Sequence, residues 1–526
     1  MPTDCIEYSD SRYFSDIIVD YLQQTAEFKK FYNLFPTIEN FKAQINEKSS
    51  NFSQAKRSIL KAELQKQSND LRLSDLSQSN INLLDSNATF TITTGHQLNI
   101  FTGPIYFLYK IVSTINLCKQ LKANYPNYNF VPVYWMATED HDFDEISYFN
   151  INNKKIRWNK NATGPVGRLD TTGLDTVFKL LEIELGIGKT ADYLKKLFQK
   201  SYLEHENLTD ATRFLVNDLF GDYGLVIIDG DSAELKSTFS DIIKSELIDN
   251  NSYKLVNDTI SGFQNYKVQV NPREINLFFI EHGLRERIVF DGNRYQINNT
   301  NRFFTKKEIL NLVDSNPEKF SPNVILRPLY QETVLPNLCY IGGGGELAYW
   351  FELKSMFEFY KTTFPVLLLR DSVLVVSKKQ TDKINKLNLF FKDLFLSQNE
   401  LINKKVKSLT DFKIDFSEQK LFLQKQFKNL FEIAKQTDKS FANAVLAQQK
   451  KQINGLSHLE KRLLKAQKRK HSELLLKITS LQDELFPNQG LQERYCNFAQ
   501  FYDDNFIQEL ILDLNPLDFN FKIIKQ

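Results

Sequence analysis

The sequence predicts an α/β protein whose parallel-sheet core is followed by a C-terminal α-helical coiled coil. Residues 88–95 (ATFTITTG) form a strand pattern, 104–122 a helix pattern that begins at proline, and 129–138 (NFVPVYWMAT) a second strand pattern. A strand–helix–strand unit implies parallel strands joined by a right-handed crossover. Residues 416–486, in contrast, contain no proline and a single glycine, and their leucines follow heptad spacing, which is typical of a coiled coil.

The chain totals exclude several classes of protein. A length of 526 residues exceeds one ordinary core, so we expect more than one domain. With 66 Lys and Arg against 64 Asp and Glu, the net charge of +2 gives no reason to expect nucleic acid or an acidic membrane as partner. The four cysteines are far apart, which excludes a CxxC motif and makes a disulfide framework implausible. The first residues lack a secretory signal pattern and no apolar run approaches the roughly 20 residues of a membrane span, so we expect a cytoplasmic protein.

The elements divide the chain into four predicted parts. Residues 1–85 have apolar positions at helical spacing and are expected to form a helical segment that packs on the core. Residues 86–378 are expected to be the sheet core. Its later strands are 223–229 (YGLVIID), the start of LCYIGGGG and 364–370 (FPVLLLR), and an antiparallel insertion spans about 265–300, where two apolar runs flank EHGLRE.

The C-terminal parts are a helical domain and a tail. Residues 379–490 are expected to form a coiled-coil hairpin or a dimer arm. The heptad seam slips after Lys470, which predicts a stutter, and Pro487 ends the pattern. Residues 491–526 are expected to pack back on the body.

The first candidate site is TTGHQLNIFTGP, residues 93–104. A turn at the carboxyl end of a parallel strand aims backbone amides at an anion, and Gly95 and Gly103 allow close approach of a ligand. His96, Gln97 and Asn99 supply polar groups. The alternative is a tight turn with a surface histidine. The stretch matches neither the P-loop pattern nor GxGxxG. Aligned with the HxGH motif of nucleotidyltransferases, residues 101–104 (FTGP) have the glycine but neither histidine.

The second candidate site is WMATEDHDFDEI, residues 135–146, where a buried strand ends in a concentration of charge. The groups are Glu139, Asp140, His141, Asp142, Asp144 and Glu145. Their mutual repulsion calls for a positive ligand group, a metal or an arginine partner. A histidine beside carboxylates suits a general base, and the carboxylate spacing also suits Mg²⁺, although no metal is firmly implied. The alternative is a solvated acidic loop.

The third candidate site is IGGGGELAYWFELK, residues 341–354. Its glycines, Gly343, Gly344 and Gly345 among them, expose backbone donors at a helix N-terminus and favour a loop that binds an anion. Glu346 either caps the helix or binds a substrate amine. Positive charge is available from four arginines: Arg285, Arg287, Arg327 and Arg370. Arg327 and Arg370 stand at the ends of apolar runs, where a buried arginine favours a carboxylate or phosphate of a ligand. The alternative is that one of them pairs with the acidic loop and has a purely structural role.

Taken in order, TGHQLNIFTGPIYFLYK, WMATEDHDFDEI, RPLYQETVLP, IGGGGELAYWFELK and PVLLLRDS resemble the bacillithiol-biosynthesis cysteine-adding enzyme family over essentially the whole chain. The resemblance implies a Rossmann-like core related to nucleotidyltransferases, inserted connecting segments and a coiled coil that makes a homodimer. It also implies a ligase that joins cysteine to glucosaminyl-malate through an amide bond, the last step of bacillithiol biosynthesis. The resemblance further implies an adenine nucleotide, ATP or ADP, in a second pocket near the coiled coil.

We therefore expect a small-molecule site built from these motifs. The expected catalytic residues are His141, Asp140, Asp144 and Glu145, with His141 deprotonating the attacking amine and the acids binding an amine. Members of the family often carry glutamine at the position of His96, which favours Gln97 and the backbone over His96. The expected substrate-binding residues are Gly95, His96, Gln97, Asn99, Gly103, Trp135, Glu139, Arg327, Gly343, Gly344, Gly345, Glu346, Tyr349 and Arg370.

Two other functions stay open at this point. A nucleotidyltransferase proper would use the same class of core, although the missing HxGH counts against it. A coiled-coil assembly protein with a non-catalytic core is the alternative of another class, and the Gly, His and acidic residues at strand ends count against it because a core without function would lose such costly residues.

Overall fold

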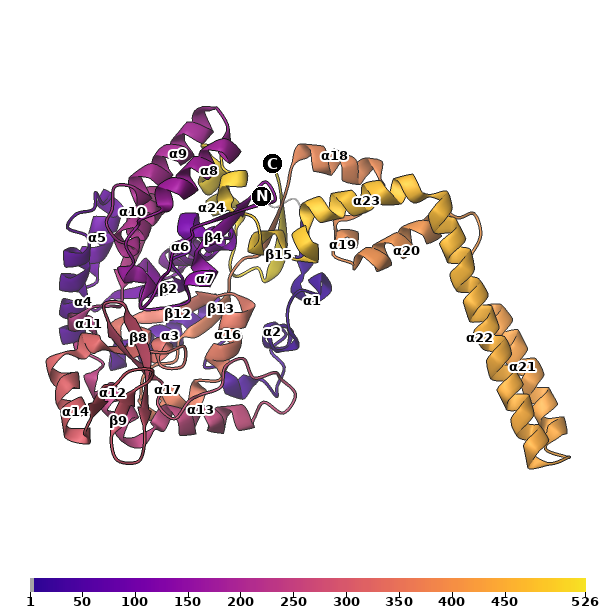
Figure 1. Cartoon of the computed structure of the whole chain (residues 1–526), viewed down its shortest axis with the longest axis horizontal. Coiled ribbons are helices and arrows are strands. Elements are labelled where there is room, and N and C mark those ends of the chain that lie inside the picture. Colours follow the sequence, from indigo (N-terminus) through magenta and orange to yellow (C-terminus); the bar gives the residue numbers. More distant parts are fainter. Residues whose placement is uncertain (1–3) are drawn as a thin grey trace. The chain divides into compact units, whose positions relative to one another are not determined.

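The computed structural model describes residues 4–526, which divide into two compact units (Figure 1). One unit contains the residues up to 375 together with 491–524, and the other contains 376–490 with the last two residues. None of the helices in the described part of the chain is both long and apolar enough to cross a membrane.

The first unit is built around a five-stranded parallel sheet with the order β13-β12-β2-β3-β6. Every neighbouring pair in this sheet runs parallel, which confirms the predicted α/β class. The predicted first crossover is present, because helix α6 (Tyr106–Asn124) connects β2 to β3. The strands are β2 (Thr89–His96), β3 (Asn129–Met136), β6 (Val226–Asp229), β12 (Asn337–Gly342) and β13 (Val366–Leu369).

The register of the sheet brings the candidate motifs to one edge. His96 pairs with Met136, and Met136 pairs with Asp229, so three strands end side by side. Gly342 pairs with Leu369 at the same edge. The loops after β2, β3 and β12 therefore meet at the carboxyl ends of the strands, where open α/β sheets bind ligands.

A second sheet of five strands lies within the same unit, with the order β10-β9-β8-β7-β11. All its pairs are antiparallel. Its strands are β7 (Leu277–Glu281), β8 (Leu284–Phe290), β9 (Tyr295–Ile297), β10 (Phe303–Phe304) and β11 (Phe320–Pro322), so the sheet extends past the expected boundary near residue 300. Because β10 and β11 have only two or three residues each, they leave no alternating pattern that could predict them.

Helices cover the sheets, and short strands join the ends of the chain. In Figure 1 the N-terminal helices and the later helices of the core surround the strands. Strand β15 (Asn520–Lys525) lies between β1 (Asp4–Glu7) and β14 (Val373–Val376) in a three-stranded sheet. A separate two-stranded sheet consists of β4 (Tyr148–Ile151) and β5 (Lys154–Arg157). The helices are α1 (Tyr8–Ser11), α2 (Asp16–Leu22), α3 (Ile38–Asn51), α4 (Gln54–Gln67), α5 (Asp75–Leu83), α7 (Phe143–Ile146), α8 (Leu174–Leu185), α9 (Lys189–Tyr202), α10 (Leu208–Phe220), α11 (Ala233–Ser237), α12 (Ser240–Asp249), α13 (Asn251–Ser261), α14 (Lys306–Ser315), α15 (Arg327–Val334), α16 (Gly344–Phe351), α17 (Lys354–Phe359) and α24 (Phe506–Asp513).

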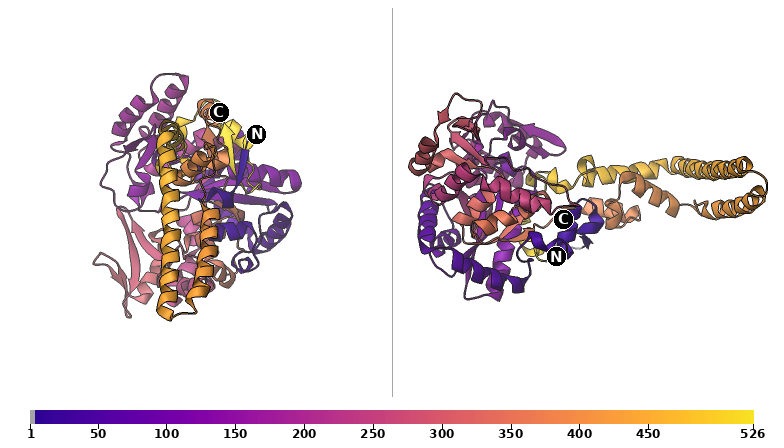
Figure 2. Two further views of the ribbon diagram at one scale, coloured as in Figure 1. Left: turned by 90° about the vertical axis from the view of Figure 1, so that its right-hand side faces the viewer. Right: turned by 90° about the horizontal axis from the view of Figure 1, so that it is seen from below.

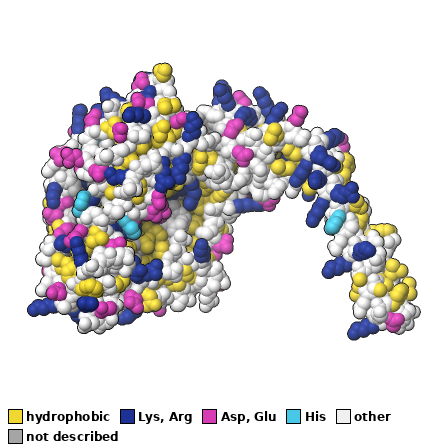
Figure 3. Space-filling view, in the orientation of Figure 1, with side chains coloured by type: hydrophobic (Ala, Val, Ile, Leu, Met, Phe, Trp, Pro, Cys, Tyr) yellow, Lys and Arg dark blue, Asp and Glu magenta, His cyan; other side chains and the backbone are white. Residues whose placement is uncertain are grey.

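The second unit is helical, and its two long helices α21 (Ser417–Ala434) and α22 (Lys439–Lys470) lie side by side (Figure 2). The remaining helices are α18 (Lys378–Lys386), α19 (Phe391–Leu394), α20 (Gln398–Ser408) and α23 (Ser472–Leu485). The chain leaves helical geometry at His471, which is where the heptad seam slips. Hydrophobic side chains are exposed on this unit (Figure 3).

Candidate active site

A cavity of about 830 Å³ opens at the carboxyl ends of the parallel strands, within the first unit. Its lining includes residues from all three glycine-containing or acidic motifs. Of the residues predicted from the sequence, it brings together Gly95, His96, Gln97, Trp135, Glu139, Asp140, His141, Glu145, Arg327, Gly343, Gly345, Glu346, Tyr349 and Arg370. Four predicted residues, Asn99, Gly103, Asp144 and Gly344, do not line it.

Asn99 and Gly103 shape the first loop instead of lining the cavity. Asn99 donates to the backbone carbonyl of Glu145 at 2.9 Å, which ties the first loop to the acidic loop. Gly103 has φ +61°, and a Cβ at this position would lie 2.7 Å from the Cβ of Asn99. The glycine is therefore required by the turn and by the close approach of Asn99.

Asp144 and Gly344 also have contacts of a structural kind. Asp144 is 82 % exposed at its side chain and forms an ion pair with Arg157. A Cβ on Gly344 would lie 3.3 Å from Ile18 of α2, so this glycine faces the helix that packs on the loop. The expectation that Asp144 binds an amine and Gly344 contacts substrate is not supported by this geometry.

His96 is buried against aromatic rings, contrary to the alternative of a surface histidine. Its ring packs against Tyr106 and Phe107, and it is 8 % exposed. Burial, with the nearby charges of Lys110 and Arg370, holds the pKa of His96 well below its usual value. The residue is therefore a neutral imidazole in the wall of the cavity.

Lys110 connects the first and third motifs, and sequence reasoning missed it. Its ammonium donates to the carbonyl of Gly95 at 2.8 Å and pairs with Glu346 at 2.5 Å. Glu346 also accepts from Tyr340 Oη at 2.8 Å and from the Gly343 amide at 2.9 Å. Burial alone would raise the pKa of Glu346, but the ion pair with Lys110 and these hydrogen bonds hold it below its ordinary value. Glu346 is thus the helix cap, and it has no need of a substrate amine. A lone lysine within the apolar run YFLYKIV was the available signal.

The glycine-loop end of the cavity carries positive charge. Arg327 donates to Gln331 at 3.0 Å and to Tyr349 Oη at 3.2 Å, and both partners are neutral. Arg370 pairs with Glu493 at 2.7 Å, but its Nε is buried and has no hydrogen-bond partner among the described residues. A Cβ on Gly345 would meet nothing within 4 Å, so the first turn of α16 faces open space. Free amides at a helix N-terminus and arginine N–H groups form a donor set for an anion.

The opposite end of the cavity carries two carboxylates bridged by one neutral amide. The Nε2 atom of Gln97 donates to Asp140 at 2.8 Å and to Glu145 at 2.7 Å. The nearest cation to Asp140 is Arg285, whose Nη1 lies 4.0 Å from it. A neutral amide donates to both carboxylates without supplying a positive charge, so the pair suits a ligand ammonium.

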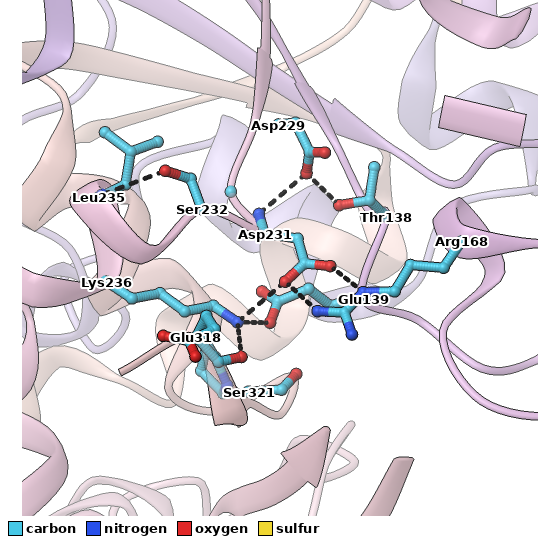
Figure 4. A network of polar contacts seen from close by, with 12 residues as sticks. Thr138, Glu139, Arg168, Asp229, Asp231, Ser232, Leu235, Lys236, Glu318 and Ser321 are labelled. Carbon is cyan, nitrogen blue, oxygen red and sulfur yellow. Dashed lines mark hydrogen bonds and ion pairs between the residues drawn. The ribbon is translucent and has the colours of Figure 1, made fainter. Parts of the chain in front are cut away.

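Glu139, the first acid of the loop, is neutralised within the protein (Figure 4). Lys236 of α11 is 1 % exposed and pairs with Glu139 at 2.6 Å and with Asp231 at 3.3 Å. Arg168 in turn donates to both oxygens of Asp231, at 2.8 and 2.9 Å. The predicted repulsion in the acidic loop is therefore offset here by a lysine and an arginine from distant segments. Neither Arg327 nor Arg370, the two arginines considered for this role, is involved.

The Nδ1 atom of His141 lies 2.6 Å from Nη1 of Arg285, a residue of the antiparallel sheet. His141 lines the cavity and its side chain is 48 % exposed. Burial and the charge of Arg285 hold the pKa of His141 below its ordinary value. Across residues 4–526, no group of three or more His, Cys, Asp or Glu side chains is arranged to hold a metal ion.

Comparison with known proteins agrees with the resemblance in the sequence. Residues 1–371 match the model of the bacillithiol biosynthesis BshC N-terminal Rossmann-like domain, and residues 373–526 match that of the BshC C-terminal coiled-coil domain. Relatives named "Putative cysteine ligase BshC" are 58 % identical in Flavobacterium psychrophilum, over 100 % of both chains, and 37 % identical in Cytophaga hutchinsonii, over 98 % of both chains. One from Staphylococcus epidermidis is 26 % identical over 83 % of this chain and 84 % of its own. The predicted Rossmann-like core and coiled coil are confirmed, and the chain belongs to the bacillithiol biosynthesis BshC family.

Proposed function

We propose that the protein is a ligase that joins cysteine to glucosaminyl-malate through an amide bond, as the last step of bacillithiol biosynthesis. The relatives named cysteine ligases support the reaction class. The observation that carries the proposal is the polarity of the cavity, which has an acidic end at Gln97, Asp140 and Glu145 and a cationic end at Arg327 and Arg370. Glucosaminyl-malate has the matching polarity, with an amine on its sugar and carboxylates on its malyl group.

The acidic end binds the amine in this proposal. Asp140 and Glu145 are held close together by Gln97, and Asn99 fixes the loop backbone at Glu145. An ammonium between the two carboxylates replaces a repulsion with two ion pairs, which offsets the cost of bringing both acids into the cavity.

The cationic end binds an anionic group. Arg327, the free Nε of Arg370 and the first-turn amides of α16 are N–H donors with fixed directions. The same donor set fits the malyl carboxylates and the phosphates of ATP or ADP. Binding of malate, ADP and glucosaminyl-malate, each measured alone, distinguishes the two anions. The ligand whose anionic group binds at the cationic end should lose affinity in Arg327→Gln, and the other ligand should not.

Amide formation requires an activated carboxyl group, since a free carboxylate is a poor electrophile. A nucleotide, when bound, supplies this activation. The sugar amine then forms a C–N bond to the cysteine carbonyl carbon, and the C–O bond to the leaving group breaks with its electron pair. The bound ammonium loses one proton to Asp140 or Glu145 before it attacks, and the second proton, released once the C–N bond has formed, passes by the same carboxylates to solvent. Closeness of the bound amine to the acyl carbon supplies much of the acceleration.

We also propose that the second unit makes a homodimer and that the enzyme is cytoplasmic. Apolar side chains remain exposed along α21 and α22: Leu421, Phe422, Leu430, Ile433, Phe441, Leu446 and Leu459. Exposed apolar side chains on a coiled-coil pair favour a second copy as its partner. Leu421→Glu with Phe422→Glu should convert the sedimentation coefficient of a dimer into that of a monomer. A wild-type monomer at micromolar concentration would contradict the dimer.

The direct test of the proposed function is product analysis. Purified protein is incubated with glucosaminyl-malate and cysteine, with ATP, with ADP and without nucleotide, and thiols and nucleotides are identified by mass spectrometry. We expect bacillithiol in at least one nucleotide condition. Absence of bacillithiol in every condition overturns the proposal, and release of pyrophosphate with a nucleotidylated sugar instead would support the nucleotidyltransferase alternative.

A further inference from the structure

Arg285 is fixed in the wall of the cavity by contacts within the antiparallel sheet. Its guanidinium lies 4.1 Å from the ring centroid of Phe278, and its Nε donates to Ser321 Oγ at 3.2 Å. Its side chain is 8 % exposed. From this position Nη1 reaches Nδ1 of His141 at 2.6 Å. The guanidinium is therefore a rigid group directed at one ring nitrogen.

This contact determines which nitrogen of His141 carries the proton. A guanidinium has only donors, so Nδ1 must accept and must be unprotonated. In a neutral imidazole the proton then resides on Nε2. None of the described residues hydrogen-bonds Nε2, and the ring lines the cavity. His141 thus offers a ligand an N–H donor, while its lone pair is occupied by Arg285.

We propose that Arg285 is a positioning residue that holds His141 in the Nε2-protonated tautomer, so that His141 meets the substrate as a hydrogen-bond donor and not as the general base. The inference rests on the proposed function for the identity of the reaction. In amide formation the Nε2–H group stabilises the negative charge that develops on the acyl oxygen as the amine attacks, which is the role of an oxyanion donor. The amine proton goes to the carboxylates of the acidic end.

Asp140 is the group that competes with Arg285 for His141. Its Oδ1 lies 3.8 Å from Nδ1, close enough to attract a proton to that nitrogen. The charged groups that act on His141 are Arg285, which lowers its pKa, and Asp140, Asp142 and Glu286, which raise it, while burial lowers it most. Without Arg285, Nδ1 is free to take a proton and pair with Asp140, so the tautomer should switch and the pKa should rise.

The test is nitrogen NMR of the whole protein with ¹⁵N-labelled histidine. The chain has six histidines, and the signals of His141 are those that disappear in His141→Gln. At a pH above the His141 pKa, we expect a protonated, pyrrole-type signal for Nε2 and a pyridine-type signal for Nδ1. A pyrrole-type Nδ1 in the wild type would overturn the inference without any variant.

Arg285→Ala should transfer the proton to Nδ1 and raise the pKa of His141. Arg294→Ala is the matched control, because Arg294 also stacks on an aromatic ring, that of Phe303, and pairs with Asp291, but does not line the cavity. An unchanged tautomer and pKa in Arg285→Ala would contradict the inference. These spectra do not depend on turnover, so they remain decisive even if no ligase activity is found.

The two roles of His141 also separate in kinetics. His141→Gln keeps a side-chain N–H donor but cannot act as a base, whereas His141→Ala removes both. A donor role predicts that His141→Gln stays within about tenfold of wild-type kcat while His141→Ala loses roughly 10²–10³-fold. Equal loss in both variants would support the base and overturn the donor role.

Discussion

The carboxylates at the two ends of the cavity have different hydrogen-bond and ion-pair partners. At the cationic end, Glu346 is paired with Lys110 and hydrogen-bonded by Tyr340 and Gly343. At the acidic end, Asp140 and Glu145 both accept from the neutral amide of Gln97, Asp140 also accepts from the backbone amide of His141 at 2.7 Å, and Arg285 lies 4.0 Å from Asp140. Glu139 of the same loop is instead paired with Lys236. In this cavity, the carboxylate in close contact with a buried lysine belongs to the scaffold, whereas the two acids held mainly by neutral donors are available to a ligand ammonium.

The largest effect should come from the scaffold. Lys236→Met leaves Glu139 and Asp231 without their shared cation in a buried position. Removing one partner of a buried ion pair costs about 3–5 kcal/mol of unfolding free energy. Denaturant unfolding measures this, with Lys244→Met as the control because its pair with Asp314 is at the surface and is worth under about 1 kcal/mol. A loss below about 1 kcal/mol for Lys236→Met would show that Glu139 is not held in this way.

The two protein carboxylates assigned to the substrate amine should affect activity and not stability. Asp140→Asn and Glu145→Gln remove charge without changing shape, so stability should change by less than about 1 kcal/mol, while kcat/KM should fall by roughly 10²-fold. Asp144→Asn is the control from the same loop, because Asp144 is exposed and paired with Arg157. Steady-state kinetics at varied glucosaminyl-malate concentration measures kcat/KM. A loss of kcat/KM in Asp144→Asn as large as that in Glu145→Gln would contradict the comparison.

A smaller effect is expected at the glycine loop. Gly345→Ala adds a methyl group that meets no protein atom within 4 Å, so the helix should become more stable by about 0.5–1 kcal/mol. The same methyl group enters the space of an anion at the cationic end and should weaken its binding by about tenfold. Gly455→Ala, also free of contacts but on α22, should stabilise without changing affinity. Binding calorimetry with malate and with ADP measures this, and an unchanged affinity for both would remove Gly345 from the site.

The last prediction depends on pH and concerns Glu352, a scaffold carboxylate that has backbone amides in place of a cation. It accepts from the amides of Gln269, at 2.5 Å, and Val270, and burial raises its pKa to about 7. Because its folded pKa lies above its unfolded value, its ionisation should cost stability as pH rises from about 4.5 to 7, with full stability below that window. Glu352→Gln should therefore unfold at higher denaturant than wild type at pH 8, and the gain should vanish at pH 4.5. A gain that is independent of pH would refute this assignment.

The sequence predicted the sheet and the motifs because each strand and its following loop are continuous in the chain. Most of the charged residues predicted after β3 and of the glycines predicted after β12 line the cavity, but Asp144 and Gly344 do not. What it could not predict was pairing between distant segments. Lys236 lies about a hundred residues after Glu139, and Glu493 about as far after Arg370, so no spacing shows that they neutralise each other. Arg285 was noted as a source of charge, but its contact with His141 depends on the antiparallel sheet.

Two features of the first loop also depend on packing that the local sequence does not show. Gly103 and Asn99 lie within the first motif and were predicted to bind substrate, but neither lines the cavity: the glycine makes room for the asparagine, which ties the first loop to the acidic loop. His96 stands beside Gln97 with the same apparent exposure, yet strand β2 includes His96 and buries it. A strand that extends one residue further than its pattern is enough to move a side chain from a loop into the wall.

The most direct test of the central claim is calorimetric binding of glucosaminyl-malate and its N-acetylated counterpart to wild type and to the double variant Asp140→Asn, Glu145→Gln. The two carboxylates should recognise the amine, so the double variant should bind glucosaminyl-malate about 10²-fold more weakly than wild type and should bind the acetylated ligand with wild-type affinity. Equal weakening of both ligands, or of neither, would contradict the assignment of the acidic end to the amine.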